Sequence, residues 1–302
     1  MIVYHYCSLD VFTKIISGKS IRLSDITKSN DSMEILWITK YIEEIFDEEF
    51  QKETEKTKYF KEDYPKDVFT ELREHYSKEF FDEEQKLYSY FVCCFSEKGD
   101  LLSQWRGYAD DGNGIAIGFD ADMLKQIGKP DINDNISADV FNFDKIEYSE
   151  RSQKSQIRKI AVDLIIDLKE IAKRKSPNLK QDSMKAYNKC FLKLFNLSIF
   201  MKNPFFSEEQ EWRICHWTQI TPKNKTSNIH INGGVTLSDI GYHMRQDDMI
   251  PHIDLKFEKC VESMIKEIVI GPKCNVREND IKTYLASNGI ECPVIKSNGT
   301  YR

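Results

Sequence analysis

The sequence has no run of about 18 consecutive apolar residues, the length that a membrane-spanning helix requires. Its opening residues, Met1–Tyr6, also lack the basic region followed by an apolar stretch that marks an export signal. We therefore expect a protein that neither spans a membrane nor is exported, and that acts in the cytoplasm.

The cysteines do not have the spacing of a metal or redox site. None of the eight forms a Cys-x-x-Cys pair, and the adjacent Cys93 and Cys94 would point to opposite faces of a strand. We expect reduced, mostly buried thiols and no bound metal ion. The sequence also lacks a Gly-rich phosphate loop, an internal repeat and a low-complexity segment.

Length and apolar content set the size of the fold. With 302 residues, of which 40% are hydrophobic, the chain can bury the core of one large domain or of two small ones. We expect a single domain, residues 1–302, that carries a charged helical insertion at 41–87 and a basic helical insertion at 150–202.

Charge is distributed unevenly along the chain. The net charge is −6, yet residues 151–202 hold 13 Lys and Arg against four Asp and Glu, a local surplus of nine. Such a segment can attract a phosphate-bearing partner, and the candidate nucleic-acid contacts are Lys173, Arg174 and Lys175. The alternative is that these charges form only the solvated surface of two long helices.

Hydrophobic spacing separates strands from helices. Runs of β-branched and aromatic residues predict strands at 2–6, 20–24, 88–96, 115–119, 211–217, 252–257, 265–270 and 293–296. Helical spacing predicts helices at 9–16, with Ser8 as N-cap and Gly18 as the end, and at 101–108, 157–171, 182–200 and 279–286. Because strands open and close the chain around helices, we expect an α+β fold with a mixed sheet.

Three polar clusters lie on or beside predicted strands, where a rigid scaffold can hold a site. They comprise residues 4–8 with 22–24, residues 94–96 with 103–108, and residues 206–213. In the third cluster, the spacing of Glu209 and Glu211 would point both carboxylates to one side of an extended chain.

Each cluster has a structural alternative. His5 can be a hydrogen-bonded strand residue without a catalytic role, and Trp105 and Tyr108, three residues apart on a helix, can be core anchors. The two carboxylates of the third cluster can be solvated charges, or one can pair with Arg213. Residues 30–34 are most simply a helix capping box.

Four blocks of the chain, taken in order, resemble a bacterial family catalogued as a domain of unknown function. They span 3–34, 91–120, 202–214 and 265–272, with the motifs His-Tyr, Asn-Asp-x-x-Glu, Cys-Phe-Ser, Trp-x-x-Tyr-Ala and Glu-x-Glu-Trp-Arg. The opening of that family is similar to the start of DarT-like and related ADP-ribosyltransferases, where a strand ending in His and a hydroxyl residue leads into a helix, a Gly and a second strand. The resemblance implies an ADP-ribosyltransferase-like mixed sheet core with helical insertions.

The resemblance also implies a site for NAD as co-substrate. By position, His5 would contact the ribose next to nicotinamide, and Glu211 would be the catalytic carboxylate, with Glu209 as the first Glu of the pair. The cofactor contacts implied besides His5 are Tyr6, Ser8, Arg22, Ser24, Ser96, Trp105 and Tyr108.

These residue types suit cleavage of the nicotinamide–ribose bond. The reaction develops positive charge on the ribose, which a carboxylate such as Glu211 stabilises. A neutral His5 can donate to a ribose hydroxyl, Trp105 or Tyr108 can stack on nicotinamide, and Arg22 can hold the pyrophosphate. No metal ion is required.

The function expected on these grounds is transfer of ADP-ribose from NAD to a macromolecule, with RNA or DNA favoured over protein because of the basic segment. A bacterial toxin or phage-defence effector would fit this activity, and an antitoxin protein is a candidate partner. One alternative is an NAD glycohydrolase, which uses water as acceptor. The other is a nucleic-acid-binding module without catalysis.

Overall fold

The computed structural model describes residues 1–29, 35–56, 88–127, 141–174, 178–219, 230–231, 235–245 and 247–301. The chain forms two compact units. Unit 1 consists of residues 1–28, 89–146 and 207–302, and unit 2 of residues 29–88 and 147–206. The single domain with insertions at 41–87 and 150–202 stays a prediction, and the capping box expected at 30–34 lies outside the described residues.

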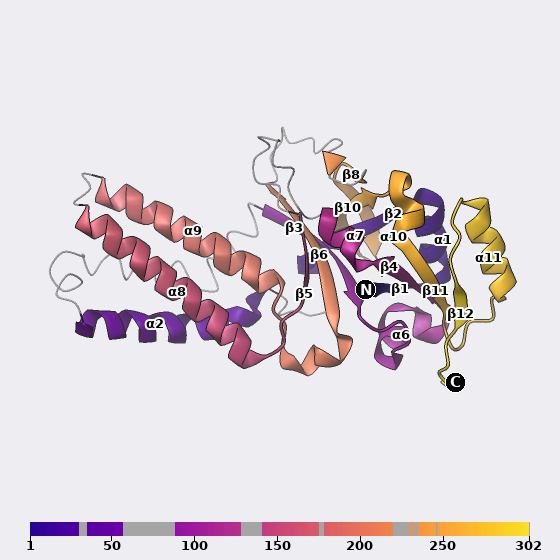
Figure 1. Cartoon of the computed structure of the whole chain (residues 1–302), viewed down its shortest axis with the longest axis horizontal. Coiled ribbons are helices and arrows are strands. Elements are labelled where there is room, and N and C mark those ends of the chain that lie inside the picture. The colour runs from indigo at the N-terminus through magenta and orange to yellow at the C-terminus, as the bar shows by residue number, and fades with distance from the viewer. Residues whose placement is uncertain are drawn as a thin grey trace. The chain divides into compact units, whose positions relative to one another are not determined.

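A twelve-stranded sheet organises the described part of unit 1 (Figure 1). Its strands are β1 (Ile2–Cys7), β2 (Ser20–Asp25), β3 (Tyr88–Ser96), β4 (Ile115–Asp120), β5 (Phe141–Lys145), β6 (Glu211–Gln219), β7 (His230–Ile231), β8 (Val235–Leu237), β9 (Gly241–Arg245), β10 (Asp248–Lys256), β11 (Ile265–Ile270) and β12 (Val294–Lys296). The order is β12-β11-β4-β1-β3-β2-β10-β8-β7, while β6 joins β3 and β5, and β9 joins β10.

The sheet is mixed and mostly antiparallel. β11 and β12 run parallel, whereas β1 with β4, β2 with β10 and β5 with β6 run antiparallel. The expectation of helices combined with a mixed sheet is therefore confirmed at this coarse level. Every strand predicted from the sequence is present, with ends shifted by a few residues.

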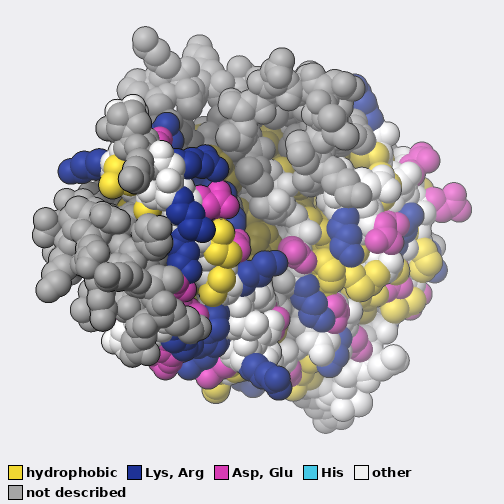
Figure 2. Space-filling view, turned by 60° about the vertical axis from the view of Figure 1, so that its left-hand side comes forward, with side chains coloured by type: hydrophobic (Ala, Val, Ile, Leu, Met, Phe, Trp, Pro, Cys, Tyr) yellow, Lys and Arg dark blue, Asp and Glu magenta, His cyan; other side chains and the backbone are white. Residues whose placement is uncertain are grey.

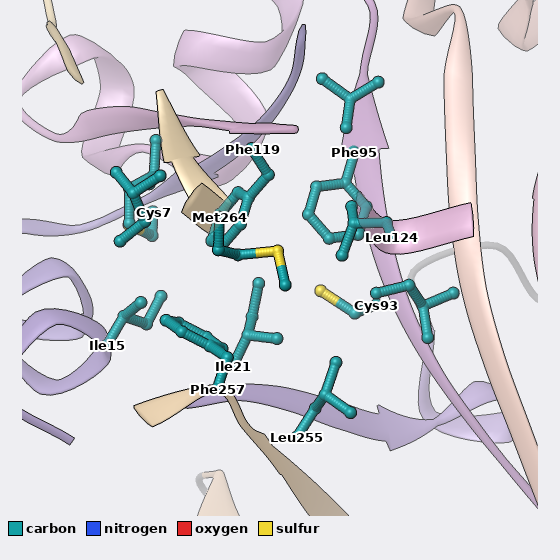
Figure 3. Close-up of a cluster of buried hydrophobic side chains, with 14 of the residues drawn as sticks. Cys7, Ile15, Ile21, Cys93, Phe95, Phe119, Leu124, Leu255, Phe257 and Met264 are labelled. Carbon is teal, nitrogen blue, oxygen red and sulfur yellow. The ribbon is translucent and has the colours of Figure 1, made fainter. Parts of the chain in front are cut away.

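Strand alternation builds the core of unit 1. On β2, Ile21 and Leu23 are buried while Arg22 between them is exposed. Side chains from the sheet and its helices converge in one cluster, where the Phe119 ring lies edge-on to Phe95 and Phe257 at 5.5 and 6.0 Å between centroids (Figure 3). This packing fixes which strand residues face inward and which remain for other roles.

Short helices complete unit 1: α1 (Leu9–Gly18), α6 (Leu102–Tyr108), α7 (Ala121–Ile127), α10 (Val261–Met264) and α11 (Glu278–Ser287). The predicted N-cap of α1 is confirmed, because Ser8 Oγ accepts a hydrogen bond from the Val11 N–H at 3.2 Å. After Gly18 the helix stops at Lys19, whose backbone is left-handed with φ 44°. Turns of 3₁₀ helix lie at 26–28, 110–112 and 258–260.

Three long helices form most of the described part of unit 2: α2 (Thr39–Lys56), α8 (Glu150–Lys173) and α9 (Leu179–Ile199). α8 packs against both α2 and α9 (Figure 1). The predicted helices at 157–171 and 182–200 are thus confirmed, and both begin earlier than expected. Within the described ranges, no helix has the length and apolar character needed to cross a membrane.

A buried glutamine joins the two ends of the α8–α9 segment. Glu147, before α8, forms an isolated parallel bridge with Met201, after α9. The Gln153 side chain is fully buried, and its Nε2 donates to the carbonyls of Glu147 and Lys202 at 2.7 and 2.9 Å. Its Oε1 accepts from Trp37 Nε1 at 3.0 Å. One amide therefore satisfies three partners from separate parts of unit 2.

We predict that Gln153→Met lowers the stability of unit 2 by about 3 kcal/mol, because three buried or half-buried polar groups lose their hydrogen-bond partner. Urea unfolding followed by circular dichroism of the helices measures this loss. Gln156→Met is the matched control, since Gln156 is exposed and, among the described residues, its side chain bonds only Ser152 Oγ. Equal stability of the two variants would contradict the role of Gln153.

Candidate functional site

Strand β3 has different neighbours along its two edges. On one edge it is joined by β6, and the Glu97 N–H donates to the Gln210 carbonyl at 3.1 Å. Because successive residues of a strand point their backbone groups to alternate edges, Ser96 and Cys94 turn theirs to the other edge. That second edge faces β1 and β2.

Two strands share this second edge of β3. β1 pairs with it where Tyr4 lies opposite Ser96, and β2 pairs with it where Ser24 lies opposite Val92. β1 and β2 therefore part beside the residues in between, 93–95. We call this place the β1/β2 split.

The His5 side chain occupies the split. Its Nδ1 lies 3.0 Å from the Cys94 carbonyl oxygen and 3.6 Å from Cys93 Sγ. The Cys94 carbonyl is one of the backbone groups that β1 would have satisfied had it continued along β3, so the imidazole replaces a strand partner. Cys93 is buried and Cys94 exposed, which confirms that the two thiols point to opposite faces.

The hydrogen bond fixes the tautomer of His5. A carbonyl oxygen only accepts, so Nδ1 carries the proton. Burial lowers the pKa of His5 below its ordinary value, partly offset by the bond to Cys94, so the ring is neutral near pH 7. Nε2 is then an acceptor. The sequence-based expectation that a neutral His5 donates to a ligand is corrected, because Nδ1–H is already used by the Cys94 carbonyl and Nε2 of this tautomer can only accept.

Two hydroxyls predicted to bind cofactor hold the chain that follows β3. Tyr6 Oη donates to the Lys98 carbonyl at 2.7 Å and accepts from the Leu101 N–H at 3.0 Å. Ser96 Oγ donates to the Glu209 carbonyl at 2.7 Å and accepts from the Lys98 N–H at 3.2 Å. Both side chains therefore position the loop between β3 and α6.

The aromatic pair of α6 divides into a core residue and a surface residue. Trp105 is 1% exposed, its Nε1 donates to Asp100 at 2.7 Å, and its ring lies edge-on to Tyr6. The core-anchor alternative therefore describes its position, and no face of this ring is open to a ligand. Tyr108 is 45% exposed, so only this member of the pair has a surface on which nicotinamide can stack.

The other residues of the first cluster that the sequence predicted to bind cofactor lie beside residues of the fold itself. Ser8 caps α1, which uses its hydroxyl as an acceptor. Arg22 is exposed on β2, and its Nε donates to Asp254 Oδ1 at 3.2 Å. Ser24 is half-buried two residues further along the same strand, opposite His252 of β10.

The two glutamates of the third cluster do not share one side of an extended chain. Glu209 ends a 3₁₀ helix (Pro204–Glu209), and Gln210 has a left-handed backbone with φ 44°. The extended geometry that would align the carboxylates is therefore absent, which corrects the sequence-based expectation.

Glu211 begins β6 and is buried. Arg213 is buried beside it, and its Nε and Nη2 both donate to Glu211 Oε1 at 2.9 and 2.7 Å. The ion-pair alternative is confirmed.

His5, Ser96 and Glu211 meet around β3 without sharing a face. Phe95 and Trp212 belong to the core, so Ser96 and Glu211 project from the opposite face of the sheet. The His5 ring packs on the core side, 5.8 Å from the Phe95 ring.

The basic helices of unit 2 are extensively paired with acids. Arg158 bonds Glu48 and Glu49 of α2 at 2.6 and 2.9 Å, and Lys169 pairs with Glu53. Between α8 and α9, Lys189 pairs with Asp167 and Lys193 with Asp163, each at 2.9 Å. Figure 2 accordingly shows positive and negative side chains interleaved on the visible face. Many of the basic side chains that the sequence analysis considered as nucleic-acid contacts are therefore paired with acidic side chains of the same unit.

The three predicted nucleic-acid contacts lie at or beyond the end of α8. Lys173 is exposed in its last turn. Arg174 is exposed and pairs with Glu170 at 3.2 Å. Lys175 lies outside the described residues.

The sequence analysis did not single out His243 and His252 as candidate site residues. Their Nδ1 atoms lie 3.3 Å apart on β9 and β10. The available signal was the alternation of His252 and Asp254 with two buried apolar residues in a predicted strand. Among the described residues, no group of three or more His, Cys, Asp and Glu side chains is placed to hold a metal ion.

Residues 104–214 match the model of a family described as Protein of unknown function (DUF2971). The match begins in α6 and ends in β6, and so includes Trp105, Tyr108, Glu211 and Arg213. This finding supports the resemblance to a family of unknown function that the sequence motifs indicated. No curated protein and no solved structure matches the chain.

The buried ion pair makes Glu211 important for stability. We predict that Glu211→Gln destabilises the protein by about 3 kcal/mol or more, because the buried Arg213 loses the carboxylate that two of its nitrogens reach. The double variant Glu211→Gln, Arg213→Gln should be more stable than the single one, because neither charge is left without the other. Chemical denaturation of the three proteins tests this; a single variant as stable as the wild type would contradict it.

His216 is a second buried histidine, on β6. It is 1% exposed, and within the described structure neither of its ring nitrogens has a hydrogen-bond partner. Burial lowers its pKa to about 4. In the unfolded chain it would take up a proton near pH 6.5, so the unfolded state binds more protons between these values.

We predict that His216 makes the fold sensitive to acid. Its contribution is complete above about pH 6.5 and is lost as the pH falls toward 4, by up to roughly 3 kcal/mol. His216→Leu removes the titrating group and should flatten the stability profile across this window. Urea unfolding between these pH values measures it, and an unchanged slope in the variant would rule His216 out as the cause.

Proposed function

We propose that this protein is an NAD-dependent ADP-ribosyltransferase that binds NAD at the β1/β2 split. The observation that carries the proposal is the neutral His5, whose Nδ1 is fixed by the Cys94 carbonyl and whose Nε2 is an acceptor for a ribose hydroxyl. The sequence resemblance assigns the same residue to the ribose. Ser96 and Glu211, on the neighbouring positions around β3, supply the hydroxyl and the carboxylate of that pattern.

The reaction requires the bond between ribose C1′ and the nicotinamide nitrogen to break, with the electron pair leaving on nicotinamide. An acceptor oxygen or nitrogen then bonds to C1′ and loses its proton. Glu211 is the candidate for stabilising the positive charge that develops on the ribose. Arg213 holds the carboxylate in one position, which favours a preorganised site.

The acceptor favoured by the sequence is RNA or DNA. The ion pairs within unit 2 weaken this preference, because Arg158, Lys169, Lys189 and Lys193 already have carboxylate partners. The exposed Lys173 still permits a phosphate contact at the end of α8. We retain nucleic acid as the first acceptor to test, and a toxin or defence role with an antitoxin partner as the setting.

The test is incubation of the protein with NAD labelled in its adenylate part, with separate pools of RNA, DNA and protein, and with no acceptor. Transfer of label to one pool supports the transferase. Release of free ADP-ribose in every reaction would select the glycohydrolase. Intact NAD together with salt-dependent RNA binding would select the non-catalytic module.

We predict that His5→Ala reduces NAD consumption by roughly tenfold, the value of one hydrogen bond to the ribose. His216→Leu is the matched control, because it replaces a buried histidine of the same unit outside the split. Melting temperatures of both variants separate lost binding from lost fold.

For Glu211, the variant to compare with the wild type is the double substitution Glu211→Gln, Arg213→Gln, which removes both charges of the ion pair. We predict that it loses on the order of 100-fold in turnover. Full turnover by that double variant would remove Glu211 from the mechanism.

A further inference from the structure

A group of polar side chains from three adjacent strands occupies one face of the sheet. On β2 and β10, Arg22 lies opposite Asp254 and Ser24 opposite His252. Residues directly opposite one another in an antiparallel pair project to the same face. On β9, Gly241 lies opposite His252, and His243 follows two residues later on that face. This is also the face from which Ser96 projects, because Val92 of β3 lies opposite Ser24.

The two histidines form a close pair. Their Nδ1 atoms are 3.3 Å apart, and their rings meet at 64° with centroids 5.2 Å apart. A Cβ atom on Gly241 would lie 2.8 Å from His252 Nε2, so the absence of a side chain there leaves room for the imidazole. At this distance a protonated Nδ1 of one ring can donate to an unprotonated Nδ1 of the other. His252 also makes a hydrogen bond with the backbone of Ile250.

Two arginines, Arg22 and Arg245, and one carboxylate, Asp254, act on the pKa values of this pair, and Asp254 is also the ion-pair partner of Arg22. Burial and then Arg22, His252 and Arg245 lower the pKa of His243, while Asp254 opposes them. Burial and then Arg22 likewise lower the pKa of His252, while Asp254 and a hydrogen bond with the Ile250 backbone oppose them. Lys28 and Asp248 pair with each other at 2.8 Å, so together they add no net charge near the two histidines.

The guanidinium of Arg22 has N–H donors that its ion pair does not use. Its Nε is used by Asp254, whereas its two Nη groups make no hydrogen bond within the part of the chain that the structure describes. Its side chain is 46% exposed, so a ligand can reach the guanidinium from solvent. A planar fork of N–H donors beside two imidazoles is chemically suited to phosphate oxygens.

We propose that Arg22, His243 and His252 form a phosphate-binding site that holds the pyrophosphate of NAD. The identity of the ligand rests on the proposed function, whereas the phosphate chemistry follows from the side chains alone. Neighbouring strands lie about 4.8 Å apart, so the pairings Val92–Ser24 and Ser24–His252 place Ser24 and His252 roughly 5 and 10 Å from β3. Arg22 follows on the same face of β2, two residues before Ser24. A dinucleotide with its nicotinamide ribose at the β1/β2 split would carry its phosphates in this direction.

A divalent metal ion between the imidazoles is the competing occupant. Arg22 and Arg245 disfavour it, because both cations raise the energy of a further positive charge at the pair. A phosphate group is instead attracted by them. It would also stabilise the protonated imidazoles and so raise the pKa of both histidines.

The first experiment titrates the full chain with inorganic pyrophosphate, by calorimetry and by NMR of the imidazole resonances. We expect binding that tightens as the pH falls from about 7.5 to about 5.5, by on the order of fivefold for each imidazole that takes up a proton. Arg22→Gln should weaken binding roughly tenfold or more. His243→Asn should reduce the pH dependence. Arg277→Gln, which breaks an exposed Arg–Asp pair at the start of α11, is the matched control and should bind normally.

Further arms distinguish the source of the phosphate from the chemistry of the site. ADP-ribose and NAD should compete with pyrophosphate, and a single-stranded oligonucleotide should not. Pyrophosphate binding that requires Arg22, without NAD binding or turnover, would leave the site standing while the proposed function fails. Turnover of NAD with an unchanged Michaelis constant in both Arg22→Gln and His243→Asn would overturn the site while the function stands. Absence of pyrophosphate binding, or displacement of the histidine resonances only by Zn²⁺, would also overturn it.

Discussion

A backbone carbonyl that needs a partner, at the point where two strands part, controls the candidate site. Cys94 presents its oxygen to the edge of β3 just where β1 has left that edge and β2 has not yet joined it. Backbone carbonyls of a strand take a partner from a neighbouring strand, a side chain or water, and here an imidazole provides the donor. The tautomer of His5 and the acceptor character of Nε2 follow from this single bond, whereas the neutral state of the ring follows from its burial, which outweighs the opposing effect of the bond on the pKa. Sheet geometry therefore determines which chemistry the residue can perform.

Structure and proposed chemistry are also linked at Glu211. A carboxylate that compensates a buried guanidinium cannot be removed without disturbing the fold, so stability and turnover are not independent readouts at this position. The same link exists in weaker form at Tyr6 and Ser96, whose hydroxyls bind the loop after β3. The side chains that resemble a catalytic set are thus also the ones that shape the loop and strand ends around them.

Local pattern predicted the elements well, whereas contacts between distant segments were beyond its reach. Alternation and spacing located β1–β4, β6, β10–β12 and the long helices α8 and α9, but not β5, β7, β8 or β9. Ser8 was recognisable as a cap because capping depends on neighbours in sequence. The kink at Gln210 was not recognisable, since a left-handed backbone at a non-glycine residue has little local signal. The pairing of α8 with acids of α2 joins residues more than 100 positions apart, so a surplus of charge counted along the chain overstated the charge open to a partner. The proximity of His243 to His252 likewise depended on β9, which the spacing did not predict.

The Gln153 bridge has a consequence for how this chain could have acquired its length. Because Glu147 and Met201 lie side by side, the residues between them leave and return at nearly the same point. The entropy of closing a loop grows only slowly with its length, and helices that pack on each other reduce that cost further. Related chains could therefore carry a longer helical pair, a shorter one or a simple turn between β5 and β6 with little change to the sheet. Variation in length within such a protein family would be expected to concentrate at this junction.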